Sequence, residues 1–168
     1  IALAKELGIL DFPAPAGGCI LADPILSKRI QRVYEGDFVM GAEDITPNDI
    51  SLMLLGRQFL LPGGGWLILG RDEKENIRLE RLYGESDATL FMEERSGPFG
   101  VLRRAGDFYT DKQALKQDLD LAAGLVVRYG KKVKTGPAGS EVTVSFQQKA
   151  VEQYADPLAD EIFHTWVL

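Results

Sequence analysis

Cysteine and histidine are nearly absent from the sequence, which has one of each, Cys19 and His164. A single cysteine excludes an intramolecular disulfide framework, and the two residues together are too few for a Cys/His zinc site built from this chain alone. No apolar run approaches the roughly 20 residues of a membrane span, so we expect no membrane partner. The Walker A, Gly-x-Ser-x-Gly, His-Glu-x-x-His and dinucleotide-binding patterns are also missing, so no complete enzyme site is visible. We therefore expect no metal and no cofactor in this chain.

What is present is an ordinary globular composition. The 168 residues are 45% hydrophobic and 26% charged, which suits one domain, or one domain with a short appendage. The chain opens at Ile1 rather than at methionine, and we expect it to be a fragment of a longer protein.

Positive charge is scarce overall but unevenly placed. The net charge is −6, a poor general prior for nucleic-acid binding, because phosphate contacts need lysine and arginine. Residues 101–134, however, carry 8 basic and 4 acidic side chains, whereas residues 135–168 carry 1 and 5. For nucleic-acid binding, the basic stretch at residues 101–134 therefore matters more than the net charge of the whole chain.

Capping and periodicity predict an α+β fold, a mostly antiparallel sheet packed by two or more helices, with a helical N-terminal segment. Asp23-Pro24 and Thr46-Pro47 each pair an N-cap with proline at the first helical position. Further helices are expected from residue 72 to about 83 and from the Thr110 cap to Gly130. Strands are expected at residues 57–61, 66–69, 89–93, 100–103 and 141–146, the first two joined as a hairpin. Residues 157–168 suggest a short helix ending in a strand.

Two Gly-Arg pairs bracket that hairpin, at Arg57 and Arg71. Each arginine is seven residues from Gly64, near the expected centre of the turn, so we expect the two side chains to lie opposite each other and to reach one face. Like charges placed opposite destabilise a sheet, so an external anion such as phosphate is one expected compensation. Neutralisation by Asp72, Glu73 or Glu75 is the other.

The other candidate polar residues also have both a binding and a purely structural interpretation. Asn76 projects from the first turn of a helix, where it could orient the Arg71 loop or tie the helix to a strand end. Arg103 and Arg104 should point to opposite faces by strand alternation. Lys131 and Lys132 lie in a Gly- and Pro-containing loop that could bind phosphate or merely be solvated.

Cys19 follows Gly17-Gly18 in a loop that no helix tolerates. Such a loop can present a reactive thiol, whose thiolate is the nucleophile. A lone cysteine is also often a small buried hydrophobe.

Two stretches together resemble a known family. Residues 15–24, PAGGCILADP, resemble the segment that follows the PP-loop ATPase domain in bacterial proteins similar to tRNA 2-thiouridylases (tRNA (5-methylaminomethyl-2-thiouridylate)-methyltransferases). Gly56-Arg57-Gln58-Phe59, residues 66–72 with Glu75-Asn76 and Leu79, and Gly97-Pro98 before an Ala-rich helix look like the NFACT-R RNA-binding domain fused to those proteins.

The resemblance implies that residues 1–46 are a linker from the preceding PP-loop region and residues 47–168 an NFACT-R-like domain. It implies an accessory domain of a cytoplasmic bacterial tRNA-thiolation enzyme, a transferase whose missing PP-loop domain would bind ATP. Its partners would be that PP-loop domain and tRNA or another structured RNA. Arg57, Arg71, Arg103, Lys131 and Lys132 would contact phosphates, with Asn76 positioning Arg71. Two alternatives are a sulfur-transfer role for Cys19 and a purely structural contact module.

Overall fold

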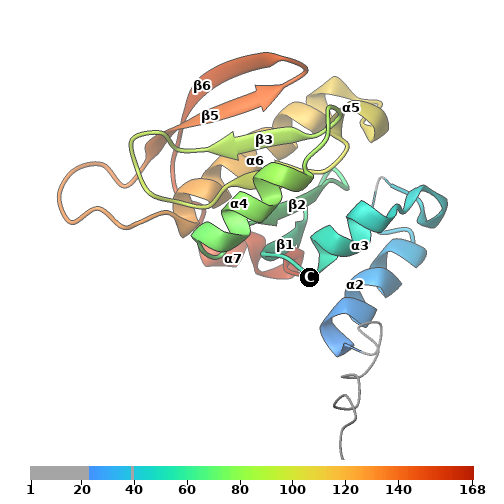
Figure 1. Ribbon diagram of the computed structural model, residues 1–168. Coiled ribbons are helices and arrows are strands. Elements are labelled where there is room, and N and C mark those ends of the chain that lie inside the picture. The colour runs from blue at the N-terminus through green and yellow to red at the C-terminus, as the bar shows by residue number, and fades with distance from the viewer. Residues whose placement is uncertain (1–22, 39) are drawn as a thin grey trace, which may run out of the picture.

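A six-stranded antiparallel sheet forms the centre of the molecule, in the order β1-β2-β4-β3-β5-β6 (Figure 1). This computed structural model describes residues 23–38 and 40–168. The strands are β1 (Arg57–Leu60), β2 (Trp66–Leu69), β3 (Ala88–Phe91), β4 (Gly100–Leu102), β5 (Ser140–Phe146) and β6 (Lys149–Ala155). The predicted α+β class is confirmed.

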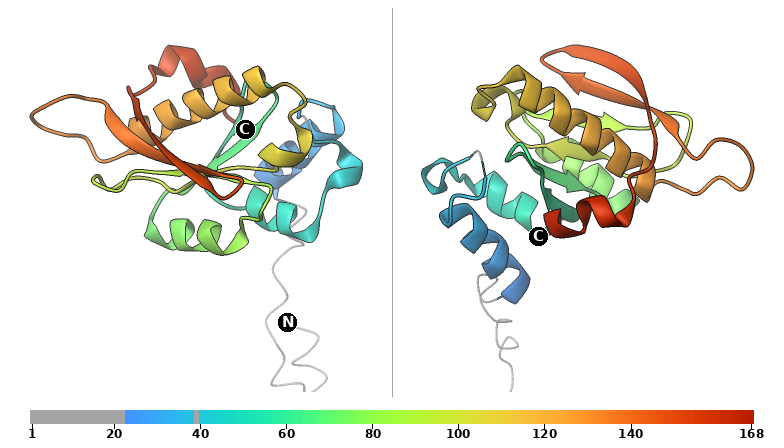
Figure 2. Two further views of the ribbon diagram at one scale, coloured as in Figure 1. Left: turned by 90° about the horizontal axis from the view of Figure 1, so that it is seen from above. Right: turned by 180° about the vertical axis from the view of Figure 1, so that it is seen from behind.

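Helices cover both faces of the sheet (Figure 2). One face carries α6 (Lys112–Tyr129) and α7 (Asp160–Phe163), and the other carries α2 (Pro24–Tyr34), α3 (Pro47–Met53) and α4 (Glu73–Leu82). The remaining short pieces are α5 (Ala105–Phe108), η2 (Ala42–Asp44) and η3 (His164–Trp166). Among the described residues, no helix is both long and apolar enough to span a membrane.

Strand β2 belongs to both hydrophobic cores, and all four of its residues are buried. Leu67 and Leu69 pack in the core beneath α6, whereas Trp66 and Ile68 pack in the core beneath α2 and α3. A strand covered on both faces has no polar side, which is why the sequence reads as an unbroken apolar run there.

Both proline-containing helix starts form as the sequence predicts. Asp23 accepts hydrogen bonds from the backbone N–H groups of Ile25 and Leu26, each at 2.9 Å. At α3, Thr46 Oγ1 accepts from the backbone N–H of Asp49, and the Asp49 carboxylate accepts from the backbone N–H of Thr46 at 2.8 Å. This reciprocal pair is a capping box, so local chemistry alone begins the helix.

Helix α6 begins one residue later than expected. Asp111, not Thr110, is its N-cap, accepting the backbone N–H of Gln113 at 2.8 Å. Asp118, about two turns further into α6, is buried and accepts the backbone N–H groups of Gly63 and Gly65. The β1–β2 turn is therefore held by a helix that comes about fifty residues later.

The register of the β1–β2 hairpin overturns the predicted alignment of Arg57 with Arg71. Leu60 pairs with Trp66 and Arg57 pairs with Leu69, so the turn spans residues 61–65 and is centred on residue 63. Gly64 adopts φ 85°, which the turn requires and which glycine tolerates best. Arg71 consequently lies beyond the end of β2, and the like charges are not opposed.

Strand β6 was not expected from the sequence. It follows β5 through Gln147 and Gln148, which both have positive φ (49° and 62°) as a two-residue type I′ hairpin requires. Asn-Gly or Asp-Gly is the usual sequence signal for this turn, so the pair Gln147-Gln148 did not indicate a hairpin. In the tail, the predicted short helix forms as α7, but the expected strand is reduced to a single bridge between Phe59 and Val167.

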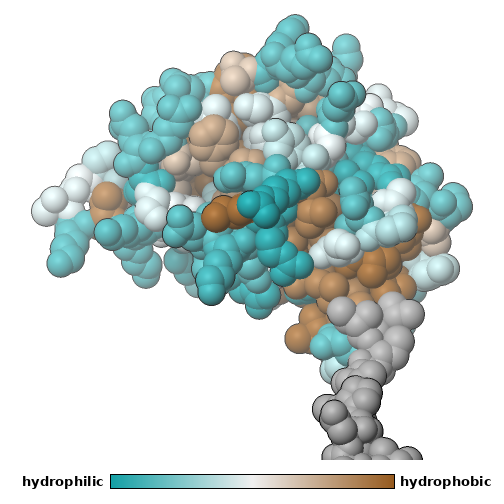
Figure 3. Space-filling view, viewed as in Figure 1, coloured by the Kyte–Doolittle hydropathy of each residue, from teal (hydrophilic) through white to brown (hydrophobic). Residues whose placement is uncertain are grey.

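Residues 23–46, assigned from the sequence to a linker, pack against the sheet. Leu26, Val33, Phe38 and Met40 are all buried in the core that contains Trp66. Figure 3 shows hydrophobic side chains gathered around α2 and α3 and hydrophilic ones over α4. Residues 23–38 and 40–46 thus help to close one face of the domain.

Candidate functional site

A cleft of about 1090 Å³ runs beside α4 and contains three of the predicted site residues, Arg71, Asn76 and Lys131. Its walls come from the β2–α4 junction, one face of α4, the connection between β3 and β4, and the end of α6. We call it the α4 cleft. Segments separated by up to sixty residues in sequence thus meet at one surface.

Asn76 joins the two walls of the α4 cleft. Its Nδ2 donates to the carbonyl oxygen of Gly97 at 3.2 Å, and its Oδ1 accepts the backbone N–H of Phe99 at 2.9 Å. A side chain at Gly70 would collide with the same Oδ1, so glycine is required there. The expectation that Asn76 ties the helix to a strand end is confirmed, and its amide is committed to that tie.

Replacing Asn76 with alanine is therefore expected to lower the free energy of unfolding by about 1–3 kcal/mol, since the Phe99 N–H and the Gly97 carbonyl lose their partners. Urea unfolding monitored by circular dichroism measures the change. Asn48→Ala, at an exposed position in the first turn of α3, is the matched control and should change stability by less than about 0.5 kcal/mol. Equal effects of the two substitutions would contradict the tie.

Arg71 forms an ion pair with Glu75 at the mouth of the cleft. Arg71 Nη2 lies 2.8 Å from Glu75 Oε1, and the same carboxylate accepts the backbone N–H of Arg71. Burial alone would raise the pKa of Glu75, but the hydrogen bonds from Arg71 outweigh it and lower that pKa. The predicted neutralisation by Glu75 is confirmed for Arg71. The Arg71 side chain nevertheless remains 53% exposed and can face a ligand.

Arg57 lies behind the cleft wall. Its guanidinium carbon is 4.6 Å from the ring centroid of Tyr129, a cleft residue, and its Nη1 donates to the Gly70 carbonyl at 3.5 Å. A cation over an aromatic face contributes about 0.5–1 kcal/mol at a partly exposed site. Arg57 therefore supports Tyr129 from behind.

Lys131 and Lys132 follow α6 and are both exposed. Lys131 lines the cleft, and its backbone N–H donates to the Ser96 carbonyl at 2.8 Å. Lys132 is not among the cleft-lining residues. Arg95, which the sequence placed only in a turn, adds a further cation and donates to the carbonyls of Val127 and Ala138.

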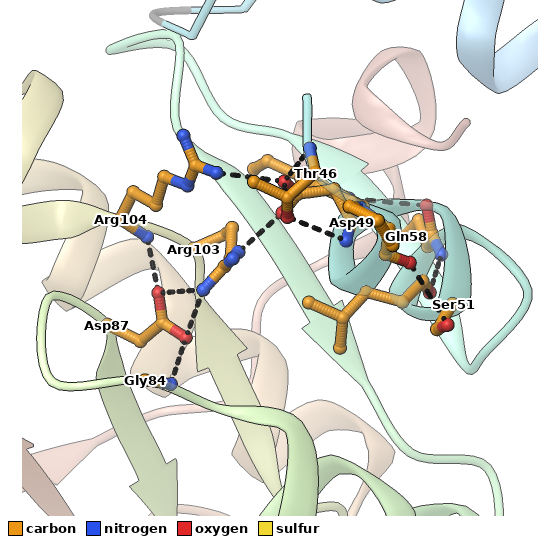
Figure 4. A network of polar contacts seen from close by, with 11 residues as sticks. Thr46, Asp49, Ser51, Gln58, Gly84, Asp87, Arg103 and Arg104 are labelled. Carbon is orange, nitrogen blue, oxygen red and sulfur yellow. Dashed lines mark hydrogen bonds and ion pairs between the residues drawn. The ribbon is translucent and has the colours of Figure 1, made fainter. Parts of the chain in front are cut away.

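Arg103 lies at the other end of β4, within a network of buried charges (Figure 4). Its Nε is 2.6 Å from Asp49 Oδ1, and its Nη1 is 2.9 Å from Asp87 Oδ2. Both carboxylates are fully buried, and the Arg103 side chain is only 10% exposed. Its guanidinium is thus occupied by two carboxylates of the protein itself, and the structure does not bring it to the α4 cleft.

The expectation that Arg103 and Arg104 point to opposite faces is wrong. Strand β4 ends at Leu102, and Arg104 has φ 50°, so strand alternation does not extend to this pair. Arg104 Nη2 reaches Asp49 Oδ2 at 3.0 Å, and both arginines therefore meet the same carboxylate.

Opposing influences act on the pKa of Asp49. Burial raises it, but hydrogen bonds from Thr46 and Arg103 outweigh burial and hold this pKa below its usual value. Burial likewise lowers the pKa of Arg103, and the two carboxylates more than offset it. Asp49 and Arg103 are therefore both charged at neutral pH.

Cys19 lies outside the described residues. Within residues 23–38 and 40–168, no group of three or more His, Cys, Asp or Glu side chains is arranged to hold a metal ion.

The site residues that the sequence did not single out are mainly aromatic. Tyr83, Phe91, Phe99 and Tyr129 all line the α4 cleft. Helical spacing gave one usable signal, since Asn76, Glu80 and Tyr83 recur at intervals of four and three and so share one face of α4. The rings from β3 and from the residue before β4 carried no such signal.

Comparison with known proteins identifies the family of this chain. Residues 56–167 match the family described as NFACT protein RNA binding domain, a match over more than half of the chain. Among solved structures, the C-terminal part of the fibronectin/fibrinogen-binding protein from Streptococcus suis is similar, with TM-score 0.51 and 14% identity over 88% of this chain and 72% of that one. At that identity the likeness concerns the fold. A search of curated protein sequences gives no match.

Proposed function

We propose, since the chain belongs to the NFACT protein RNA binding domain family, that the α4 cleft is where this RNA-binding domain contacts RNA. The observation that carries the proposal is the meeting of Arg71, Asn76 and Lys131 at one cleft inside the matched region. Arg71 and Lys131 contact phosphates, and Asn76 positions the Arg71 loop through its tie to Gly97 and Phe99.

The charge around the cleft sets the strength of binding. Asp72, Glu73, Glu80 and Glu93 also line it, so cations and carboxylates alternate there. Few phosphates can then be neutralised, and we expect weak binding that falls as salt rises, because each phosphate contact releases counterions.

Arg103 is not among the proposed phosphate contacts, because its guanidinium is bound by Asp49 and Asp87. Arg57 contributes through Tyr129, and Lys132 remains a peripheral phosphate contact on the same loop as Lys131.

The finer proposal is that the RNA is tRNA and that the parent protein is a cytoplasmic thiolation enzyme with an ATP-binding PP-loop domain. It is supported by the residue 15–24 segment and its Cys19. The complete parent sequence tests it: a PP-loop motif upstream supports the proposal, and a different upstream domain removes it together with the sulfur-transfer role of Cys19.

A second candidate function is contact with another domain or subunit. Ile25 and Tyr34, on α2, are large hydrophobic side chains left exposed, and they favour such a contact on the face away from α6.

Arg71→Gln combined with Lys131→Gln is expected to weaken RNA binding about tenfold in 50 mM salt and to reduce the slope of log Kd against log salt by about 1–2. Fluorescence anisotropy with a labelled tRNA measures both quantities. Lys112→Gln with Lys149→Gln is the matched control, because it removes the same charge from exposed positions outside the cleft. Equal weakening by both pairs, or no RNA binding even at low salt, contradicts the proposal.

A further inference from the structure

Three aromatic rings stand in a row along the α4 cleft. The ring centroids of Tyr83 and Phe99 are 6.0 Å apart, and those of Phe99 and Phe91 are 6.1 Å apart with an interplanar angle of 21°. All three line the cleft, and Tyr83 is 47% exposed. Aromatic rings that line a cleft are the kind of platform on which unpaired bases stack.

The cations lie at the start of α4, where the Phe99 backbone is also tied to Asn76. Arg71 precedes the helix and Tyr83 follows it, and ten helical residues span about 15 Å. Lys131 lies at the Arg71 end, because its backbone bonds to Ser96, next to the Gly97 carbonyl that Asn76 holds. Glu80, three residues before Tyr83, disfavours phosphate at the Tyr83 end of α4.

A duplex does not fit this arrangement. The faces of paired bases are stacked inside an A-form helix, so the three rings would have no partner. Recognition of a duplex backbone instead needs cations spread along it, and here they lie at one end, beside Asp72 and Glu73. With about 3.4 Å per stacked nucleotide, 15 Å corresponds to roughly four nucleotides.

We infer that the α4 cleft takes a short unpaired stretch of RNA, about four nucleotides long, with bases stacked on Tyr83, Phe99 and Phe91 and phosphates at Arg71 and Lys131. This inference rests on the proposed function and adds the class of RNA and the direction in which it lies. Stacking carries most of the affinity, and the cations anchor one end.

The test compares a labelled unstructured hexanucleotide with a blunt RNA duplex of twelve base pairs, each titrated with the whole chain. Tyr83→Leu should weaken hexanucleotide binding about five- to fiftyfold, a range expected for the loss of one stacked base. Its slope of log Kd against log salt should stay unchanged, because no phosphate contact is lost. Tyr83→Phe keeps the ring and should bind like the original chain.

Tyr154→Leu is the matched control, since Tyr154 is 55% exposed on β6 and does not line the α4 cleft. Hexanucleotide binding that is weakened by Tyr83→Leu but not by Tyr154→Leu supports the inference. Binding that needs Arg71 and Lys131 but is indifferent to Tyr83, or a duplex that binds as tightly as the hexanucleotide, overturns the inference and leaves the proposed function standing. Failure of every RNA to bind removes both.

Discussion

Replacing Asp49 with alanine is expected to lower the free energy of unfolding by about 3–5 kcal/mol, the range for removing one partner of a buried ion pair. The change leaves Arg103 and Arg104, whose side chains are 10% and 14% exposed, without their shared carboxylate. It also removes the hydrogen bonds that Asp49 exchanges with Thr46 at the start of α3. Urea unfolding at pH 7 measures the loss.

Asp120→Ala provides the control, because Asp120 also pairs with a cation, Lys116, but on the exposed face of α6. Its effect should stay below about 1 kcal/mol. A similar loss of unfolding free energy from both substitutions would show that burial of the Asp49 network adds nothing to stability. Arg103→Gln should resemble Asp49→Ala in stability and leave the RNA affinity of the folded protein unchanged, unlike Arg71→Gln.

The same network gives stability a defined dependence on pH. Since the pKa of Asp49 is lower in the folded chain than in the unfolded chain, its stabilisation is fully present above the unfolded value, about 3.9. It is lost as pH falls through the lower, folded pKa. The original chain should therefore lose stability below about pH 4 more steeply than Asp49→Ala does.

A chain shortened to residues 47–168 is expected to lose most of its stability, and one shortened to residues 56–168 should not fold cooperatively. The first lacks Leu26, Val33, Phe38 and Met40, each worth about 1.5–3 kcal/mol when buried. Removing them also exposes the apolar surface of Trp66 and Ile68 in the same core, and a typical domain is stable by only about 5–15 kcal/mol. The second also lacks Leu52 and Met53, which are fully buried.

Thermal unfolding followed by circular dichroism compares these chains with residues 23–168, which keep every contact described above. A chain of residues 47–168 with the same midpoint and steepness as the longer one would mean that α2 is an appendage. The family match begins at residue 56, so this experiment also asks whether the matched region suffices for the fold.

Sequence reasoning succeeded where the signal is local. Asp23 and Thr46 begin their helices through bonds to residues two or three positions away, and these bonds can be anticipated from the residue types. The β1–β2 hairpin was found from its glycine-rich turn. Its register was not, because Asp118, which helps to fix that turn, lies more than fifty residues downstream.

The candidate site divides in the same way. The placement of Asn76 at a strand end could be anticipated from its position at the start of α4. The buried ion pairs of Arg103 could not be anticipated, since its partners Asp49 and Asp87 lie 54 and 16 residues away in the sequence. Both carboxylates must also be buried beside it, which no local pattern indicates. The aromatic row is a tertiary feature, because Tyr83 follows a helix, Phe91 ends β3 and Phe99 precedes β4.

The two hydrogen bonds of Asn76, one donated and one accepted, affect how the cleft binds a ligand. By joining α4 to the residues before β4, it holds the two walls of the cleft at a fixed separation in the unliganded protein. The conformational entropy of ordering those walls is lost when the chain folds and not when RNA arrives. The cleft is thus preorganised, so we expect little affinity to be lost to molecules whose cleft is not yet formed. Ordering on binding then falls to the RNA, and a flexible single strand bears more of it than one already held open in a loop.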